Sequence, residues 1–192
     1  MKQDIILAGV GGQGILSIAY VIDNAALADG LFFKQAEVHG MAQRGGAVQS
    51  HMRLSDGSIW SDLIPKGAAD MILSVEPLEA LRYFDHLKPD GIVVTSSTPY
   101  RNIPDYPDVA QILEAVRRAP RHVVIDSEKL AKEAGTVKAQ NIVLLGAAAS
   151  FLILKEASLL ATIDALFRPR GLPVLEANLR AFDLGKKAAL GS

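Results

Sequence analysis

The first stretch whose residues could carry chemistry is the glycine-rich segment Gly9–Gly14, G-V-G-G-Q-G. It satisfies the pattern G-x-G-x-x-G, in which glycines let backbone N–H groups approach an anion at the N-terminus of a helix. The apolar run Asp4–Ala8 precedes it, and apolar residues at helical spacing follow it from Ile15 to Leu27. We therefore predict an anion-binding turn between a strand and a helix. Its candidate contacts are Gly11, Gly12, Gln13 and Gly14.

A nicotinamide cofactor fits this turn poorly. In dinucleotide-binding proteins an acidic residue about 20 positions beyond the glycines binds the ribose. Here that residue would be Glu37. It lies farther along the chain than this spacing, in the glycine-bearing segment 36–46 that is interpreted below as a loop. Two interpretations of the turn stay open. It binds a phosphate-bearing ligand, or its glycines only allow a tight turn and close packing of the helix on the strand.

A second candidate is the tripeptide Arg44-Gly45-Gly46. A guanidinium group has five donors in one plane, and glycine tolerates positive φ, so the combination suits a clamp for a phosphate or a carboxylate. The alternative is a turn whose arginine forms a surface ion pair. His39 and His51 flank the tripeptide without further ligands at metal spacing, which favours a structural or solvent-facing role for both.

The rest of the chain offers no self-sufficient catalytic machinery. We find no nucleophile elbow, zinc-binding helix motif, P-loop or useful carboxylate pair. The remaining arginines that might form a basic patch are interpreted as solvated helix ends; they are Arg117, Arg118, Arg121, Arg168 and Arg170.

The composition of the chain excludes several classes of ligand and partner. The chain has 192 residues, 49% of them hydrophobic, which is enough for one buried core. A net charge of -1 without charge blocks argues against nucleic acid as a partner. The absence of cysteine excludes thiolate ligands for a metal or an iron–sulfur cluster in this chain. No signal peptide or membrane span is apparent, so we expect a cytoplasmic protein and no membrane partner.

Buried strands alternate with helices over the first two-thirds of the chain. Strands are predicted at Asp4–Ala8, Leu31–Phe33, Ala69–Ser74, Gly91–Thr95 and Val123–Asp126. This order predicts an α/β fold with a Rossmann-like, doubly wound, mostly parallel sheet. Ligands of such sheets bind at the carboxyl ends of the strands. Those ends would carry the Gly9–Gly14 turn, the loop around Arg44, Ser74-Val75-Glu76 and Ser96-Ser97-Thr98.

Other segments complete the predicted fold. Residues 36–46 are interpreted as a loop, and Ala47–Leu54 as a strand that forms a hairpin insertion with Ser58–Trp60 across Asp56-Gly57. Helices are predicted at Pro77–Leu87, Ala110–Arg118 and Glu128–Ala134, the last capped by Asp126 or Ser127. A helical C-terminal region would comprise a buried helix, Asn141–Leu154, and two amphipathic helices, Ser158–Phe167 and Val174–Lys187.

The two glycine-bearing stretches together resemble a known family. The stretches A-G-V-G-G-Q-G-I-L (Ala8–Leu16) and E-V-H-G-M-A-Q-R-G-G-A-V (Glu37–Val48), with K-A-Q-N-I-V-L-L-G (Lys138–Gly146), are similar to the gamma subunits or domains of 2-oxoacid:ferredoxin oxidoreductases. Within that family the likeness is greatest to the small (beta) subunits of indolepyruvate ferredoxin oxidoreductases. The resemblance covers nearly the whole chain and implies a single gamma-type domain over residues 1–190.

The resemblance implies a function that no single motif reveals. The chain would be a subunit of an enzyme that oxidatively decarboxylates an aryl 2-oxoacid with coenzyme A, giving acyl-CoA, carbon dioxide and reduced ferredoxin, and it would be inactive alone. Thiamine diphosphate, Mg²⁺ and iron–sulfur clusters would belong to a large (alpha) subunit. Ferredoxin would interact with this chain only as part of the complex. Coenzyme A contact would fall on Gly11–Gly14 and on Arg44–Gly46, or these residues would hold a facing segment of the large subunit. The buried helix from Ile142 and the amphipathic C-terminal helices are alternative elements of that subunit interface.

Two alternatives stay open. The chain would serve another 2-oxoacid, such as pyruvate, 2-oxoglutarate or a branched-chain acid, or it would be a free-standing nucleotide-binding module or NAD-dependent enzyme.

Overall fold

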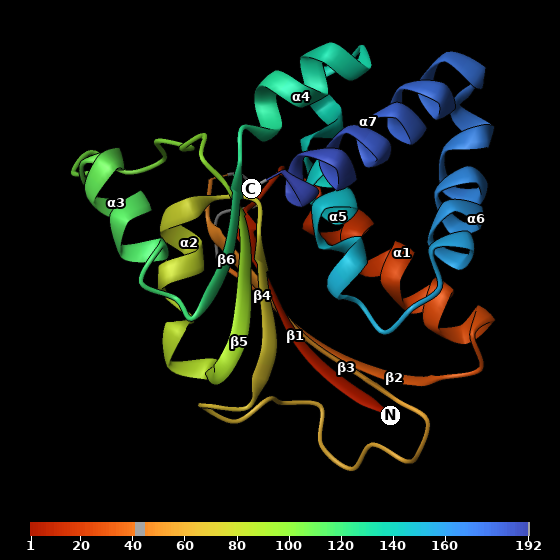
Figure 1. Cartoon of the computed structure of the whole chain (residues 1–192), viewed down its shortest axis with the longest axis horizontal. Coiled ribbons are helices and arrows are strands. Elements are labelled where there is room, and N and C mark those ends of the chain that lie inside the picture. The colour runs from red at the N-terminus through yellow and green to blue at the C-terminus, as the bar shows by residue number, and fades with distance from the viewer. Residues whose placement is uncertain (41–44, 192) are drawn as a thin grey trace.

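The computed structural model describes residues 1–40 and 45–191 and is built around one six-stranded sheet (Figure 1). The strand order is β2-β3-β1-β4-β5-β6. The strands are β1 Lys2–Val10, β2 Phe32–His39, β3 Ala47–Ser55, β4 Ala69–Ser74, β5 Leu87–Ser96 and β6 Arg121–Ile125. β1, β4, β5 and β6 pair in parallel, whereas β3 runs antiparallel to both β1 and β2. The predicted α/β fold with a mostly parallel sheet is confirmed.

Helices cover the two faces of the sheet unequally. One face carries α1 (Ile15–Ala28), α5 (Gln140–Ala148), α6 (Glu156–Phe167) and α7 (Leu172–Leu190), with α4 (Ser127–Ala134) packed on α5 and α7. The other carries the short helices α2 (Pro77–Leu81) and α3 (Val109–Val116). Because β1 is buried on both faces, its side chains alternate between two cores: Ile5 and Leu7 lie in the larger, Ile6 in the smaller.

The hairpin differs from the prediction. Ala47–Leu54 is a strand, but Ser58–Trp60 is not, and residues 36–39 belong to β2 rather than to a loop. Ser55 pairs with Lys2 of β1 on one side and with Phe32 of β2 on the other. Both edges of β3 are therefore occupied, and none is left for residues 58–60. The hairpin of the fold is β2–β3.

Two predicted helices are shorter than expected. The helix that begins at Pro77 ends at Leu81, and a 3₁₀ turn leads into β5, which begins at Leu87. The predicted helix over residues 141–154 ends at Ala148. There the Gln3 amide stabilises a non-helical path: its Nε2 donates to the Phe151 carbonyl (2.7 Å), and its Oε1 accepts from the Ile153 amide (3.1 Å).

The remaining predicted helices are present with ends shifted by a few residues. Asp126 is the N-cap of α4, because its carboxylate accepts a hydrogen bond from the Lys129 amide (2.9 Å). Among the described residues, none of the helices combines the length and the apolar character needed to cross a lipid bilayer.

Candidate functional site

The glycine turn connects β1 to α1 as predicted. Gln13 folds back on it: its backbone N–H donates to the Val10 carbonyl (3.0 Å), and its Oε1 accepts from the Val10 N–H (2.8 Å). Gly14 precedes α1 with φ +79°, and a Cβ there would lie 2.6 Å from Asn141 Nδ2. The same Nδ2 donates to the Gly14 carbonyl (3.1 Å). Both the backbone conformation and the close approach of α5 therefore require glycine.

The two predicted motifs meet at this turn. The Gly11 N–H donates to the Gly46 carbonyl (2.8 Å), and the Gly45 N–H donates to the Gly11 carbonyl (3.3 Å). Asn102 Nδ2 donates to the Gly45 carbonyl (2.7 Å), so the connection after β5 reaches the same place. The structure thus brings Gly11, Gly45 and Gly46 together. Arg44 lies outside the described residues.

A buried carboxylate fixes the connection after β5. Glu76 is the N-cap of α2 and accepts from the Glu79 amide (2.8 Å). It also accepts hydrogen bonds from the Tyr100 N–H (3.3 Å) and from the Tyr106 hydroxyl. Burial, together with the Glu76 carboxylate, raises the pKa of Tyr106, which keeps its hydroxyl a donor. Sequence reasoning placed Glu76 near the strand ends but gave no signal of this role.

A cavity of about 830 Å³ opens beside the turn, within the range of about 300–1,000 Å³ that is typical of small-molecule sites. Gly12, Gln13 and Gly14 line one wall, and residues 98–100 line the next. The facing wall comes from the helical C-terminal region, through residues 135–138, Asn141 and α7. The cavity therefore lies at the carboxyl ends of β1 and β5, where the fold class predicts a ligand.

The cavity holds donors and positive charge. Lys138 and Arg170 line it, and neither forms an ion pair with any residue that the structure describes. The Arg170 guanidinium lies 5.3 Å from the centre of the Phe167 ring, which also lines the cavity. Within residues 1–40 and 45–191, the N–H groups of Gly12 and Gly14 have no hydrogen-bond acceptor. Such an arrangement suits an anionic group of a ligand.

Arg170 is thus a cavity residue rather than only a solvated helix end, and sequence reasoning missed it because its wall is built by distant helices. Arg118 and Arg168 agree with the earlier interpretation, since each pairs with an acid one helical turn before it, at 3.2 and 2.5 Å. Arg121 lies over the Phe151 ring at the other end of the sheet.

The structure gives no metal site in the described part of the chain, where no three His, Asp or Glu side chains gather. His51 has the predicted structural role: it is buried, and its Nδ1 accepts a hydrogen bond from the Ile64 amide (3.0 Å). Burial lowers the pKa of His51, as do the nearby His86 and Arg53. The side chain of His39 lies outside the described part of the structure.

Comparison with known proteins decides the family. The sequence pattern of the family described as pyruvate ferredoxin/flavodoxin oxidoreductase matches residues 4–188. The chain belongs to this family. The indolepyruvate oxidoreductase subunit IorB of Thermococcus kodakarensis is 38% identical over 200 residues, which cover 98% of this chain and 97% of that subunit. The predicted family resemblance is therefore confirmed, and this family member is a subunit of an oxidoreductase.

Solved structures confirm the fold. The keto/oxoacid ferredoxin oxidoreductase gamma subunit of Geobacter sulfurreducens superposes with a TM-score of 0.74 at 22% identity and covers 99% of both chains. The 2-oxoglutarate:ferredoxin oxidoreductase of Magnetococcus marinus, with 2-oxoglutarate, coenzyme A and succinyl-CoA bound, superposes with a TM-score of 0.80 at 24% identity. All of this chain matches there, but it spans only 31% of that longer chain.

Proposed function

We propose that the chain is the small subunit of a 2-oxoacid:ferredoxin oxidoreductase that acts on an aryl 2-oxoacid of the indolepyruvate class. Residues 1–190 would form its single gamma-type domain, and the complex would work in the cytoplasm. The full-length similarity to the Thermococcus kodakarensis subunit supports the substrate class. In this proposal a large subunit binds the 2-oxoacid and passes electrons to ferredoxin.

The proposed reaction divides between two chains. The bond between the carboxylate and the carbonyl carbon breaks and releases carbon dioxide, a C–S bond forms with coenzyme A, and two electrons pass to ferredoxin while the thiol proton leaves. Thiamine diphosphate with Mg²⁺ and iron–sulfur clusters, held by the large subunit, would supply the carbanion chemistry and the electron transfer. A chain without cysteine supplies no thiolate for a cluster.

The cavity beside the glycine turn is the proposed site for the phosphates of coenzyme A. One observation carries this proposal: Gly12 and Gly14, whose N–H groups have no acceptor among the described residues, line the same cavity as the cations Lys138 and Arg170. Backbone amides and cations together are the usual partners of phosphate. Arg44 would add a third cation, since Gly45 and Gly46 lie against Gly11. Coenzyme A is bound in the Magnetococcus marinus relative of the same fold, which agrees with this choice of ligand.

The test is steady-state kinetics of the complex reconstituted with its large subunit. We expect Lys138→Ala and Arg170→Ala each to raise the KM for coenzyme A about tenfold and to leave the KM for the 2-oxoacid unchanged, since each removes a charge-assisted hydrogen bond. Lys66→Ala is the matched control, because Lys66 pairs with Asp85 in a distant loop. An unchanged KM for coenzyme A in both variants would refute the assignment. Arg44→Ala in the same assay tests the third cation.

Two other functions make different predictions. A gamma subunit for pyruvate, 2-oxoglutarate or a branched-chain acid would show its highest kcat/KM with that acid in a substrate panel. A free-standing nucleotide-binding module, which the glycine turn alone would favour, would bind NAD or FAD with micromolar affinity in calorimetry of the isolated chain. No detectable binding of either dinucleotide to the isolated chain, together with activity only in the complex, supports the accessory subunit.

A further inference from the structure

One part of the sheet surface is left without a helix. α1 lies over β2 and β3 on one face, whereas on the other face α2 lies over β1, β4 and β5 (Figure 1). Side chains alternate along a strand, and Phe33 of β2 packs into the core on the α1 side. Phe32, Lys34 and Val38 therefore project from the opposite face of β2, beyond the reach of α2.

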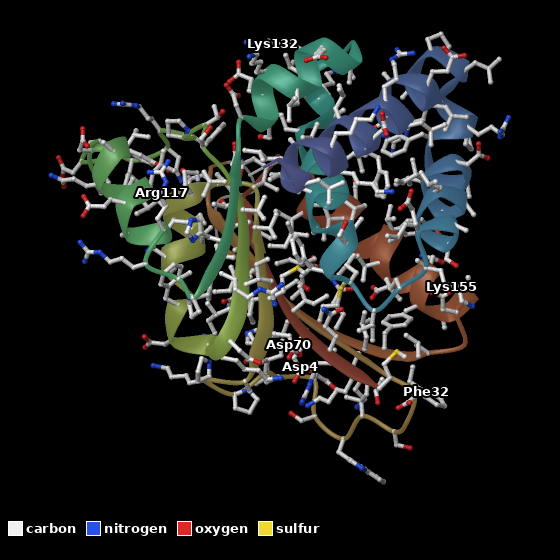
Figure 2. The ribbon with its side chains drawn as sticks, in the orientation of Figure 1. Asp4, Phe32, Asp70, Arg117, Lys132 and Lys155 are labelled. Atoms are coloured by element: carbon white, nitrogen blue, oxygen red, sulfur yellow. The ribbon has the colours of Figure 1, made fainter. Side chains whose placement is uncertain are left out.

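The loop between β3 and β4 lies beside Lys34, near the amino end of β2. Asp4 holds the Arg53 guanidinium (Nε to Oδ1 2.8 Å), and Arg53 Nη1 donates to the carbonyls of Ser61 (3.0 Å) and Leu63 (3.1 Å). Lys34 Nζ lies 3.0 Å from Asp62 Oδ1. In Figure 2, Asp4 and Phe32 are labelled at the end of the molecule where this loop turns. Residues of β1, β2 and β3 together therefore hold this loop in place.

This arrangement presents large apolar side chains to solvent. We call the surface formed by Phe32, Lys34, Trp60 and Leu63 the Trp60 face. Trp60 is 91% exposed and Phe32 58% exposed. Since an aromatic side chain buries about 150–250 Å², these two leave roughly 300 Å² of aromatic surface. A standard protein interface buries about 800 Å² on each partner. The exposed aromatic surface of the Trp60 face is therefore large enough to form the apolar centre of such an interface.

The charges next to the face are already neutralised within the chain. Lys34 pairs with Asp62, and Arg53 pairs with the buried Asp4. Among its described residues the face therefore carries no unpaired charge, and it complements an uncharged, apolar surface. Tryptophan in a rigid, preorganised loop is typical of the residues that dominate binding energy. These observations together favour a protein partner on this face.

We propose that the Trp60 face is the surface on which the large subunit docks, through an uncharged apolar strip of that subunit. The inference rests on the proposed function, since it needs a large subunit to exist. It places the docking surface at the amino end of the sheet, away from the cavity at the carboxyl ends, so that the partner can bind without filling the cavity. Trp60, for which residue-by-residue reasoning predicted a place in a hairpin strand, becomes the centre of an interface.

The single tryptophan of the chain provides a direct probe. The full-length chain, labelled with 5-fluorotryptophan, gives one ¹⁹F resonance from Trp60. We expect this resonance to shift when unlabelled large subunit is added, and to lose the H₂O/D₂O isotope shift that marks contact with solvent. A resonance that keeps its position and isotope shift in the complex would overturn the inference. A concentration-dependent shift of the chain alone would mean that a second copy binds there, which overturns it as well.

Variants separate the interface from the proposed function. Trp60→Ser and Leu63→Ser should each raise the Kd for the large subunit at least tenfold, while Leu27→Ser should change it less than twofold. Leu27 is a matched control because it is 58% exposed, like Leu63, but lies on α1. Equal Kd values for all three variants would place the interface elsewhere. If the unaltered chain forms no active complex with a thiamine-binding subunit, the proposed function fails instead.

Discussion

A buried acid in the helix that follows the glycine turn should make stability depend on pH. Asp23 lies on the inner side of α1 and is 7% exposed, and its Oδ1 has no hydrogen-bond partner within the described residues. Burial, and secondarily the nearby Glu37, raises the pKa of Asp23 to about 7 from its ordinary value of 3.8. The perturbation we choose is Asp23→Asn, which keeps the shape of the side chain and cannot ionise.

The magnitude follows from linkage. Between pH 4 and pH 7 the unfolded chain has lost the Asp23 proton, whereas the folded chain still holds it. The free energy of unfolding therefore falls as pH rises through this window, by up to about 1.4 kcal/mol per pH unit, and levels off above pH 7. Over the three pH units this amounts to at most about 4 kcal/mol. Asp23→Asn lacks this decline, so its stability relative to the unaltered chain should rise with pH.

The assay is urea unfolding of both proteins at pH 4.5, 6 and 8. The difference in unfolding free energy should become more favourable to Asp23→Asn by about 2–4 kcal/mol between the lowest and the highest pH. Any constant cost of burying the amide cancels in that comparison. Asp85→Asn is the control, because a hydrogen bond from Lys66 lowers the pKa of Asp85, which is the opposite sign. Parallel stability curves for Asp23→Asn and the unaltered chain would refute the reasoning.

Three further substitutions test how the cavity walls are held. Tyr106→Phe removes the hydroxyl that donates to the buried carboxylate capping α2, and should lower the free energy of unfolding by about 1–3 kcal/mol in urea titrations. Gly146→Ala would place a methyl group 2.0 Å from the Phe182 carbonyl oxygen, so α5 and α7 must separate; a loss of about 1–3 kcal/mol and a lower Tm are expected. Asn141→Ala removes the hydrogen bond to the Gly14 carbonyl and should raise the KM for coenzyme A severalfold, with the KM for the 2-oxoacid unchanged.

The glycine turn shows which structural features a local sequence pattern can predict. An apolar run, a glycine cluster and a helical repeat are all local signals, so the turn and the helix after it were predictable from residues 4–27. The hairpin was not, because strand pairing is decided by which edges are free. Alternation along residues 47–54 predicts a strand but not its neighbours, and β1 and β2 occupy both edges of β3. Ser58–Trp60 was therefore assigned to a strand when it forms part of a fixed loop.

Only one wall of the cavity could be predicted from the sequence, for a related reason. The wall at Gly12–Gly14 belongs to a motif that suggests a ligand. Lys138 and Arg170 lie more than 100 residues away in sequence, and no phosphate-binding motif surrounds either of them. Their placement depends on close packing of α5 against α7 and on Asn141, whose side chain joins α5 to the Gly14 carbonyl.

This joint gives the helical C-terminal region a role in the site as well as in the core. Asn141 both lines the cavity and fixes the glycine at the N-terminus of α1, so the orientation of the turn's N–H groups depends on where α5 lies. Because α5 is buried from Asn141 to Ala148, it cannot shift without repacking the core. The backbone geometry of the turn near residue 12, where we propose that an anion binds, is thus set by packing around residue 141, a dependence that the glycine pattern alone does not reveal.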